Sequence, residues 1–280
     1  MKPLAGSAAL TERAWQRLQH AARRAALWGV ACGLLLGLLL FAPAGWLATA
    51  LHRASGERLL LADARGSIWS GDAVLVLGGG PGSRDASALP GRLHWKLRPH
   101  WRGLVLRARQ GCCLQDELRV ELRPAWGGFT LVLPPRPGGI GRWPARWLAG
   151  LGTPWNTLQL GGTLQLTSPG FTLQMVEGRP RFDGALELQL QGASSTLVPV
   201  DPLGSYRLQL RGDAAGGNAP TLTLQTLDGA LQLAGSGQWT GARLRFRGDA
   251  RAAPGQEAAL ANLLNIIGKR QGALSVISIG

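Results

Sequence analysis

Apolar and polar residues alternate along most of the second half of the chain. Strict alternation predicts strands with one buried face, and the Gly, Pro, Asp and Asn residues between the runs predict turns. The alternating runs are 157–166 (TLQLGGTLQL), 171–176, 185–192, 206–212, 221–225, 230–239 and 242–248. The first half repeats the pattern less regularly. The chain is therefore predicted to be mainly β, an antiparallel meander whose Gln, Arg and Thr positions face water.

Two short helices are predicted to interrupt the strands. Residues 143–151 (WPARWLAGL) have Pro144 near their start. Residues 256–270 place an apolar stripe along one helix face, followed by Gly268 as a C-cap and by Lys269 and Arg270 at the negative end of the helix dipole. A last strand, ALSVISI, follows. Such a meander predicts a long curved sheet or an open barrel, whose inner face must be buried against something.

The N-terminal part of the chain has a different pattern. Residues 25–51 contain no charged side chain, and 27–47 supply about 20 mostly apolar residues, enough to cross a bilayer core. Basic residues precede this run, so the positive-inside rule places the N-terminus in the cytoplasm. A cleaved signal peptide is the rival interpretation, because Ala48-Thr49-Ala50 resembles a cleavage site. The apolar run is longer than a signal peptide needs, which favours a single uncleaved transmembrane helix.

The predicted organisation follows from this pattern. Residues 1–24 form a cytoplasmic segment, 25–51 the transmembrane anchor, and 52–280 a periplasmic β-rich domain. The helix at 143–151 separates two halves of that domain, 52–142 and 153–280. The predicted location is the inner membrane, single-pass, with the bulk of the chain in the periplasm.

The chain is strongly basic, with a net charge of +14. Its basic residues alternate along strands, as in Arg243, Arg245 and Arg247, and no zinc-finger spacing or RNA-binding motif accompanies them. Nucleic acid is therefore not a predicted partner. An anionic lipid surface or an acidic protein fits this charge better.

The cysteines and histidines predict no metal or cofactor site. Cys112 and Cys113 are adjacent, and neighbouring cysteines rarely bridge each other because one peptide unit fits disulfide geometry badly. Cys32 lies in the apolar run. The four histidines do not pair at metal-ligand spacing. No role is assigned to the adjacent pair, and it is expected to be dispensable.

The stretch RGSIWSGDA, residues 65–73, combines serine, glycine and an acid as some enzymes do. It lacks the GxSxG spacing, no histidine lies between His52 and His94, and a strand rather than a helix follows. It is therefore interpreted as a structural corner. The strand is expected to continue through it with bends at Gly66 and Gly71, and Trp69 is expected to anchor the core.

A second enzyme-like stretch is GGGPGSRDAS, residues 78–87. It follows a strand, as a phosphate-binding loop does, but it lacks the Lys-Ser/Thr ending and no helix follows it. We predict a hairpin loop. No catalytic residue is predicted anywhere in the chain, so it is not expected to be an enzyme.

Several motifs together resemble the type II secretion system protein N family, also called general secretion pathway protein N. They are PAGWLATAL at 43–51, the G-x-x-W-S-G-x-A pattern at 66–73, L-x-W-x-L around Trp95, PARWLAGLGTPWNTLQLGG at 144–162, and LLNIIGKRQGALSVISIG at 263–280. The resemblance covers nearly the whole chain. It implies a non-catalytic inner-membrane accessory subunit, without a cofactor, of the machine that exports folded proteins from the periplasm.

Two functions are carried forward from the sequence. The first is docking onto other type II secretion subunits. The alternative is lipid binding or transfer, because repeated GxLxLxG hairpins also resemble the AsmA-like proteins, whose apolar inner face can carry acyl chains. The side chains expected to line such a groove are Leu158, Leu160, Leu164, Leu166, Leu186, Leu188 and Leu190.

Overall fold

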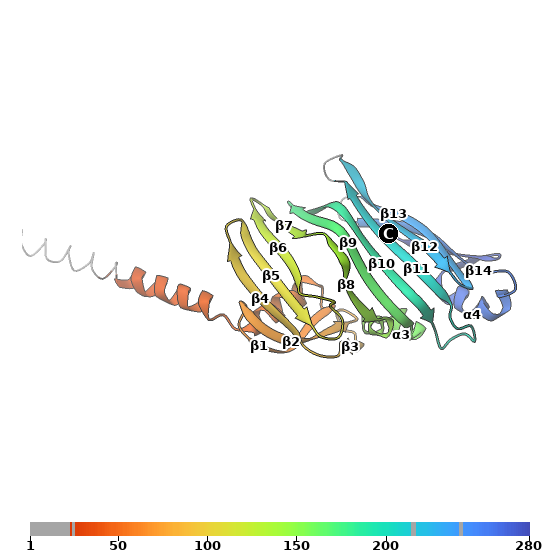
Figure 1. Cartoon of the computed structure of the whole chain (residues 1–280), viewed down its shortest axis with the longest axis horizontal. Coiled ribbons are helices and arrows are strands. Elements are labelled where there is room, and N and C mark those ends of the chain that lie inside the picture. The colour runs from red at the N-terminus through yellow and green to blue at the C-terminus, as the bar shows by residue number, and fades with distance from the viewer. Residues whose placement is uncertain (1–22, 24–25, 214–216, 241–242) are drawn as a thin grey trace, which may run out of the picture. The chain divides into compact units, whose positions relative to one another are not determined.

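A computed structural model describes residues 23, 26–213, 217–240 and 243–280 of the chain (Figure 1). Its contacts divide the chain into two compact units, with the boundary between Pro43 and Ala44. The predicted cytoplasmic segment 1–24 lies outside the described residues, apart from Arg23.

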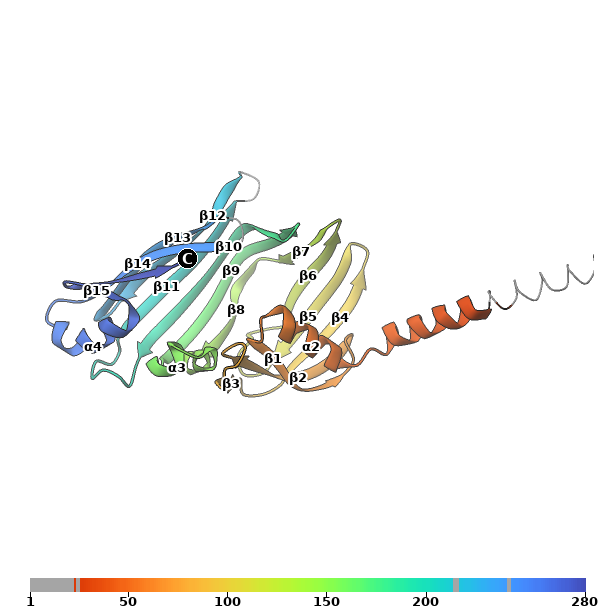
Figure 2. The same cartoon turned by 180° about the vertical axis from the view of Figure 1, so that it is seen from behind.

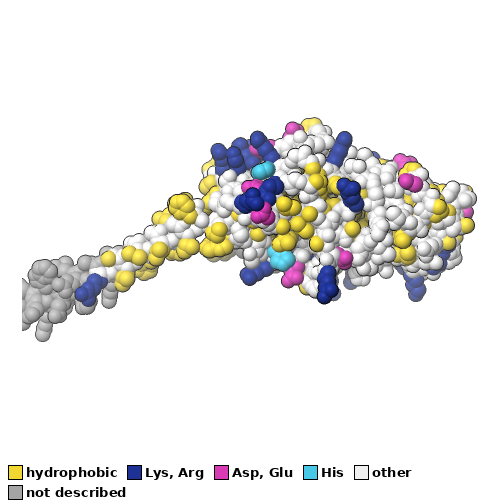
Figure 3. All heavy atoms as spheres, turned by 90° about the horizontal axis from the view of Figure 1, so that it is seen from below, with side chains coloured by type: hydrophobic (Ala, Val, Ile, Leu, Met, Phe, Trp, Pro, Cys, Tyr) yellow, Lys and Arg dark blue, Asp and Glu magenta, His cyan; other side chains and the backbone are white. Residues whose placement is uncertain are grey.

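The first unit contains a helix over residues 26–40. Its leucines are exposed, for example Leu34 (63 %) and Leu35 (67 %), and Figure 3 shows mainly hydrophobic side chains along it. Among the described residues, none of the helices combines the length and the apolar character needed to span a membrane.

Helix α2 (Ala44–Ala54) belongs to the second unit and packs on its sheet. Ala44 and Ala48 lie one turn apart on the same face, and both are buried beside Leu61, Ala73 and Trp95. Small side chains let the helix approach the strands closely (Figure 2). Residues 44–51, which the sequence assigns to the anchor, are thus the first part of the β unit.

Over the residues that the structure describes, the strands of the second unit form one antiparallel sheet of 16 strands. The strands are β1 (Leu59–Gly66), β2 (Ser70–Gly78), β3 (Ala86–Ala88), β4 (Leu93–His100), β5 (Gly103–Gln110), β6 (Leu118–Ala125), β7 (Gly128–Leu133), β8 (Arg136–Pro144), β9 (Gly161–Val176), β10 (Arg179–Ser194), β11 (Gly204–Asp213), β12 (Asn218–Asp228), β13 (Leu231–Thr240), β14 (Arg243–Ala252), β15 (Lys269–Gln271) and β16 (Leu274–Ile279).

The strand order is β1-β2-β4-β5-β6-β7-β9-β10-β11-β12-β13-β14-β16-β15, with β3 paired to β2 and β8 to β9. Nearly every strand pairs with the next one along the chain, which is the predicted meander. Within the described residues, β1 and β15 are the ends of this order and do not pair with each other. The predicted antiparallel, mainly β fold is confirmed, and the sheet is open rather than closed. The division into halves at 52–142 and 153–280 stays a prediction.

One predicted strand boundary is wrong. The sequence places a strand at 157–166 and another at 171–176, whereas the structure has a single 16-residue strand, β9, that begins at Gly161. Residues 157 and 158 instead belong to helix α3 (Trp155–Leu158), which follows Pro154 and ends where Gln159 adopts φ 44°. Proline favours a helix start and a left-handed residue ends it, and both effects override the alternation of Thr157 to Leu160.

Both predicted helical interruptions are present. The first is the 3-10 helix η1 (Ala145–Leu151), preceded by Pro144. The second is α4 (Glu257–Ile267), with Gly268 at its C-cap. Gly268 is extended (φ −168°) rather than left-handed, so the chain passes directly into β15, and Lys269 and Arg270 are strand residues.

The two faces of the sheet follow the alternation. Leu166 pairs with Leu188, Leu188 with Leu208, and Leu208 with Leu224, so one leucine row crosses four strands on the inner face. Where α3 and α4 cover this face, one buried cluster contains Leu158 of α3 together with Leu260, Leu263 and Leu264 of α4. The covering helices therefore supply the second layer that an open sheet needs.

Candidate functional site

The corner at residues 65–73 is a tight turn between β1 and β2. Gly66 pairs with Gly71 across the hairpin. The Ser67 amide donates to the carbonyl oxygen of Ser70 (2.9 Å), and the Ser70 amide donates to Ser67 Oγ (3.2 Å). The expectation that the strand continues through this stretch is wrong, because these hydrogen bonds reverse the chain. The Ser67 hydroxyl thereby holds the turn.

The buried tryptophan of this corner is Trp95 rather than Trp69. Trp69 is half-buried, whereas Trp95 on β4 is 3 % exposed. Trp95 is paired with Gly71, and a Cβ at Gly71 would lie 2.6 Å from the indole ring and 2.4 Å from the carbonyl oxygen of Arg65. Only glycine allows this approach. The expected core role of Trp69 is therefore corrected, and Trp95 fills it.

Arg92 joins two carboxylates across the β1–β2 hairpin. Its Nη1 lies 2.8 Å from Asp63 Oδ2, its Nη2 donates to the Asp63 carbonyl oxygen (2.6 Å), and its Nε donates to Asp72. Hydrogen bonds from Arg92 and then Arg65 lower the pKa of Asp63, and the bond to Asp72 raises the pKa of Arg92. The carboxylate of Asp72, the acid in the enzyme-like stretch, is therefore paired with Arg92.

The glycine-rich stretch 78–87 is a hairpin loop, as predicted. β3 folds back on β2, with Val76 opposite Ala88. The amide of Asp85 donates to Ser83 Oγ (3.1 Å), and Asn156 Nδ2 donates to Asp85 Oδ2 (3.2 Å), which ties the loop to α3. The side chains of Ser83 and Asp85 are thus engaged with the protein itself.

Cys112 and Cys113 form a disulfide with each other. The expectation that adjacent cysteines stay unbridged is wrong here. The pair lies in the loop between β5 and β6, where the Cys113 carbonyl oxygen accepts a hydrogen bond from the Arg142 amide (2.7 Å) of β8. This loop runs beside β8, because Leu114 also forms a bridge to Gly141. The turn in this loop lies against β8 and holds the Sγ atoms of Cys112 and Cys113 together.

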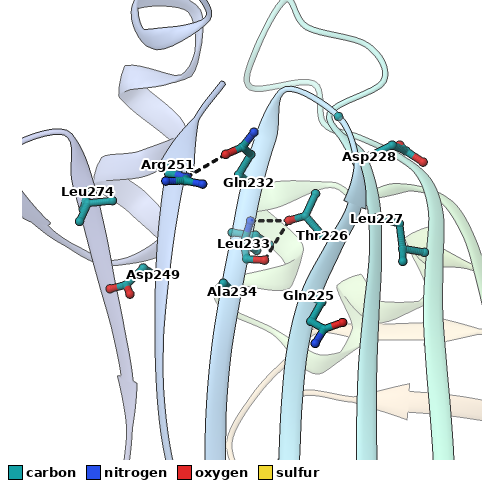
Figure 4. Close-up of a pocket in the computed structure, with 11 residues that line it drawn as sticks. Gln225, Thr226, Leu227, Asp228, Gln232, Leu233, Ala234, Asp249, Arg251 and Leu274 are labelled. Carbon is teal, nitrogen blue, oxygen red and sulfur yellow. Dashed lines mark hydrogen bonds between the residues drawn. The ribbon is translucent and has the colours of Figure 1, made fainter. Parts of the chain in front are cut away.

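Open pockets on the sheet are lined by both polar and apolar side chains. The first, of about 700 Å³, lies between β12, β13, β14 and β16 (Figure 4). In it Arg251 Nε donates to Gln232 Oε1 (2.7 Å), and Thr226 Oγ1 both donates to and accepts from the backbone of Leu233. The side chains of Arg251 and Gln232 are thus hydrogen-bonded to each other, and that of Thr226 is hydrogen-bonded to the backbone, which stabilises the sheet.

The second pocket, of about 790 Å³, lies beside the disulfide loop. Glu117 binds two arginines there, with Arg107 Nε at 3.7 Å and Arg109 Nη2 at 2.7 Å. Within the described part of the chain, no three His, Cys, Asp or Glu side chains come together as a metal site would need. On the face seen in Figure 3, basic side chains form separate groups with acidic ones among them.

The leucines expected to line a groove divide into two groups. Leu158 and Leu164 are buried (7 % and 6 % exposed), so they are core residues. The others are half-buried along the inner face of β9 and β10 and of the preceding turn: Leu160, Leu166, Leu186, Leu188 and Leu190. The structure thus leaves part of the predicted apolar surface open.

The sequence singled out Trp95 as a structural residue but did not reveal its place against Gly71, and it did not reveal the role of Arg92 or the disulfide. Arg92 lies 29 positions from Asp63. A signal for Trp95 existed, since it is the central residue of the L-x-W-x-L pattern.

The family model of the type II secretion system (T2SS) protein N matches residues 57–276. The match covers nearly all of the β unit and well over half of the chain. The chain belongs to this family. Comparison with curated proteins and with solved structures gave no match. The predicted family is therefore confirmed, and with it a place among the components of type II secretion, a system of the cell envelope whose protein N family is non-catalytic.

Proposed function

We propose that the chain is an inner-membrane accessory subunit of the type II secretion system that acts by docking onto other subunits rather than by catalysis. The family match over residues 57–276 carries this proposal. The site geometry agrees with it, because the serines and acids of the 65–73 corner and the glycine-rich loop are engaged in holding turns together.

We further propose that the first unit anchors the chain, with residues 1–24 in the cytoplasm and the β unit in the periplasm. The packing of α2 limits the part of the span 25–51 that can enter a bilayer to residues before Ala44. The described helix over residues 26–40 is about 22 Å long, so residues on either side of it would have to complete a span of the roughly 30 Å hydrocarbon core.

The ends of the sheet are the proposed docking surfaces. In the described part of the chain, β1 and β15 each pair with one neighbour, so each offers an edge to which a partner strand can add. Exposed apolar side chains lie close to both edges: Leu60 (40 %) on β1, and Ile266 (40 %) and Leu274 (39 %) beside β15. A partner strand that covered them would bury apolar area as well as form backbone hydrogen bonds.

Photocrosslinking in cells tests this proposal. A photoreactive amino acid is placed at Leu60, and a matched control at Gln191, which is exposed on the central strand β10. We expect position 60 to yield adducts with other type II secretion subunits and position 191 to yield few. Adducts with unrelated proteins only, or equal yields at both positions, would contradict docking at the edge.

Lipid binding is a second candidate, favoured by the half-buried inner-face leucines. Leu166, Leu188 and Leu208 stand side by side in register, where an acyl chain could lie across them. Mass spectrometry of the purified full chain should then find phospholipid that is lost when Leu188 and Leu208 become Ser. A Gln189→Ser change on the opposite face is the control, and equal lipid content in both proteins would exclude this role.

A further inference from the structure

Three consecutive hairpin turns lie at the same end of the sheet. They connect β4 to β5, β6 to β7 and β9 to β10, strands that are neighbours in the sheet order (Figure 1). Their central residues are Trp101–Arg102, Trp126–Gly127 and Glu177–Gly178. The last two turns touch, because the Glu177 amide donates to the carbonyl oxygen of Gly127 (3.2 Å). We call these three turns the hairpin tips.

The hairpin tips carry two exposed tryptophans. Trp101 is 76 % exposed and Trp126 is 104 % exposed. In the second turn Trp126 precedes Gly127, which takes the left-handed position (φ 76°) that such a turn requires. A single exposed apolar residue is ordinary, but two tryptophans on neighbouring turns form a surface that water solvates poorly.

The same end of the sheet is basic. Arg102 stacks over the Trp101 ring, with its Cζ 4.1 Å from the ring centroid. Arginines outnumber acids around the hairpin tips, and one of the acids, Glu121, is already bound by Arg119 and Arg123 (3.1 and 2.8 Å). The other cationic residues nearby are Arg98, Arg179 and Arg181. Glu177 is the acid within the hairpin tips themselves, and the arginines still outnumber it and Glu121, so the surface combines tryptophan with a net positive charge.

The opposite end of the sheet is built differently. There the inner face is closed by η1, α3 and α4, and the leucines beneath the two α-helices are buried. At the hairpin tips the inner face runs out to the end of the strands, where Phe129 on β7 is still 37 % exposed. Apolar surface thus reaches the same end as the tryptophans and arginines.

We propose that the hairpin tips contact the headgroup region of an anionic phospholipid bilayer, with Trp101 and Trp126 at the interface. Tryptophan prefers this depth because its ring is apolar and its N–H is polar, and arginine is drawn to the negative surface charge of such a bilayer. The turns project from the ends of the strands, so they can enter a deformable surface such as a headgroup layer. This inference does not depend on a role in secretion.

The test uses the full chain in vesicles. A photoreactive amino acid replaces Trp101 or Trp126, and a control replaces Trp155, an α3 residue that is 37 % exposed at the opposite end. The chain is reconstituted into vesicles of phosphatidylethanolamine and phosphatidylglycerol, or of phosphatidylcholine alone, with radiolabelled lipid. We expect lipid adducts at 101 and 126 at about ten-fold the yield at 155, falling several-fold without the anionic lipid.

Equal yields at all three positions, no lipid adducts, or yields independent of phosphatidylglycerol would overturn the proposal. The same variants irradiated in cells provide the second measurement. Lipid adducts there support bilayer contact, whereas protein adducts alone at position 126 would show that the hairpin tips bind a protein partner instead.

Discussion

The indole N–H of Trp95 donates a hydrogen bond to the carbonyl oxygen of Ile68, 3.2 Å away. This bond ties β4 to the turn between β1 and β2, 27 residues earlier in the chain. The Leu97 amide adds a second tie by donating to the carbonyl oxygen of Trp69 (2.7 Å). These two hydrogen bonds fasten β4 to the turn between β1 and β2, beneath α2.

Replacing Trp95 should cost far more stability than replacing Trp69. Trp95→Ala removes a buried ring and its hydrogen bond, and we expect a loss of about 3–5 kcal/mol in the free energy of unfolding. Trp69→Ala, at a half-buried position, is the matched control and should cost about 1–2 kcal/mol. Urea unfolding of the two variants measures this difference, and a larger loss for Trp69→Ala would refute the assignment.

Gly71→Ala should be strongly destabilising although it adds a single methyl group. The new Cβ would meet a carbonyl oxygen at 2.4 Å and the Trp95 ring at 2.6 Å. We expect a loss of about 2–4 kcal/mol, because backbone must move to relieve the overlap. Gly111→Ala is the control, since nothing lies within 4 Å of its Cβ position. Equal melting temperatures for the two variants would show that the approach of Trp95 to Gly71 is looser than described.

The Arg92 ion pairs should make this hairpin sensitive to acid. The pKa of Asp63 is lowered in the folded chain, so its contribution to stability is fully present above the ordinary value of 3.8 and is lost as pH falls through the lower folded value. Arg92→Gln should therefore reduce stability at neutral pH, and the gap from the unaltered chain should narrow below pH 3.8.

Unfolding curves across that pH range measure the difference in the free energy of unfolding between Arg92→Gln and the unaltered chain. Arg98→Gln, which changes an exposed arginine on β4, is the control. A gap for Arg92→Gln that stays constant down to strongly acidic pH would contradict the linkage to Asp63.

The bond between Cys112 and Cys113 should be detectable directly. Without reduction, the peptide that contains both residues should be about 2 Da lighter than its dithiol form and should resist alkylation. Because the two cysteines are adjacent, the closed loop is very short, so changing both to Ser should cost about 1 kcal/mol or less. Full alkylation of the unreduced chain would contradict the disulfide.

The period of the sequence predicted the fold well because alternation reports directly which residues face the core. The strands β11 to β14 and helix α4 were predicted within about four residues, whereas β10 begins at Arg179, well before the predicted start at residue 185. Alternation failed at Thr157 to Leu160, where Pro154 starts a helix that the pattern does not record. It also could not show that β9 runs without interruption through Pro169 and Gly170.

The candidate site was harder to predict, because burial depends on which strands become neighbours. Trp69 and Trp95 both lie in strand-like stretches, and only the pairing of β2 with β4 places Trp95 over Gly71. The hydrogen bond from Arg92 to Asp63 likewise depends on two turns, the one between β1 and β2 and the one before β4, because together they bring these residues to the same place. The exposure of Trp101 and Trp126 follows from the exact position of each turn, which alternation defines only within a few residues.

Secretion by the native bacterium tests the central claim most directly. The chain is deleted, and the fraction of a type II substrate that remains in the periplasm is measured with and without a plasmid copy. We predict that the folded substrate accumulates in the periplasm, that the plasmid copy restores export, and that a Leu60→Asp copy present at normal level does not. Undiminished export in the deletion strain would contradict the account.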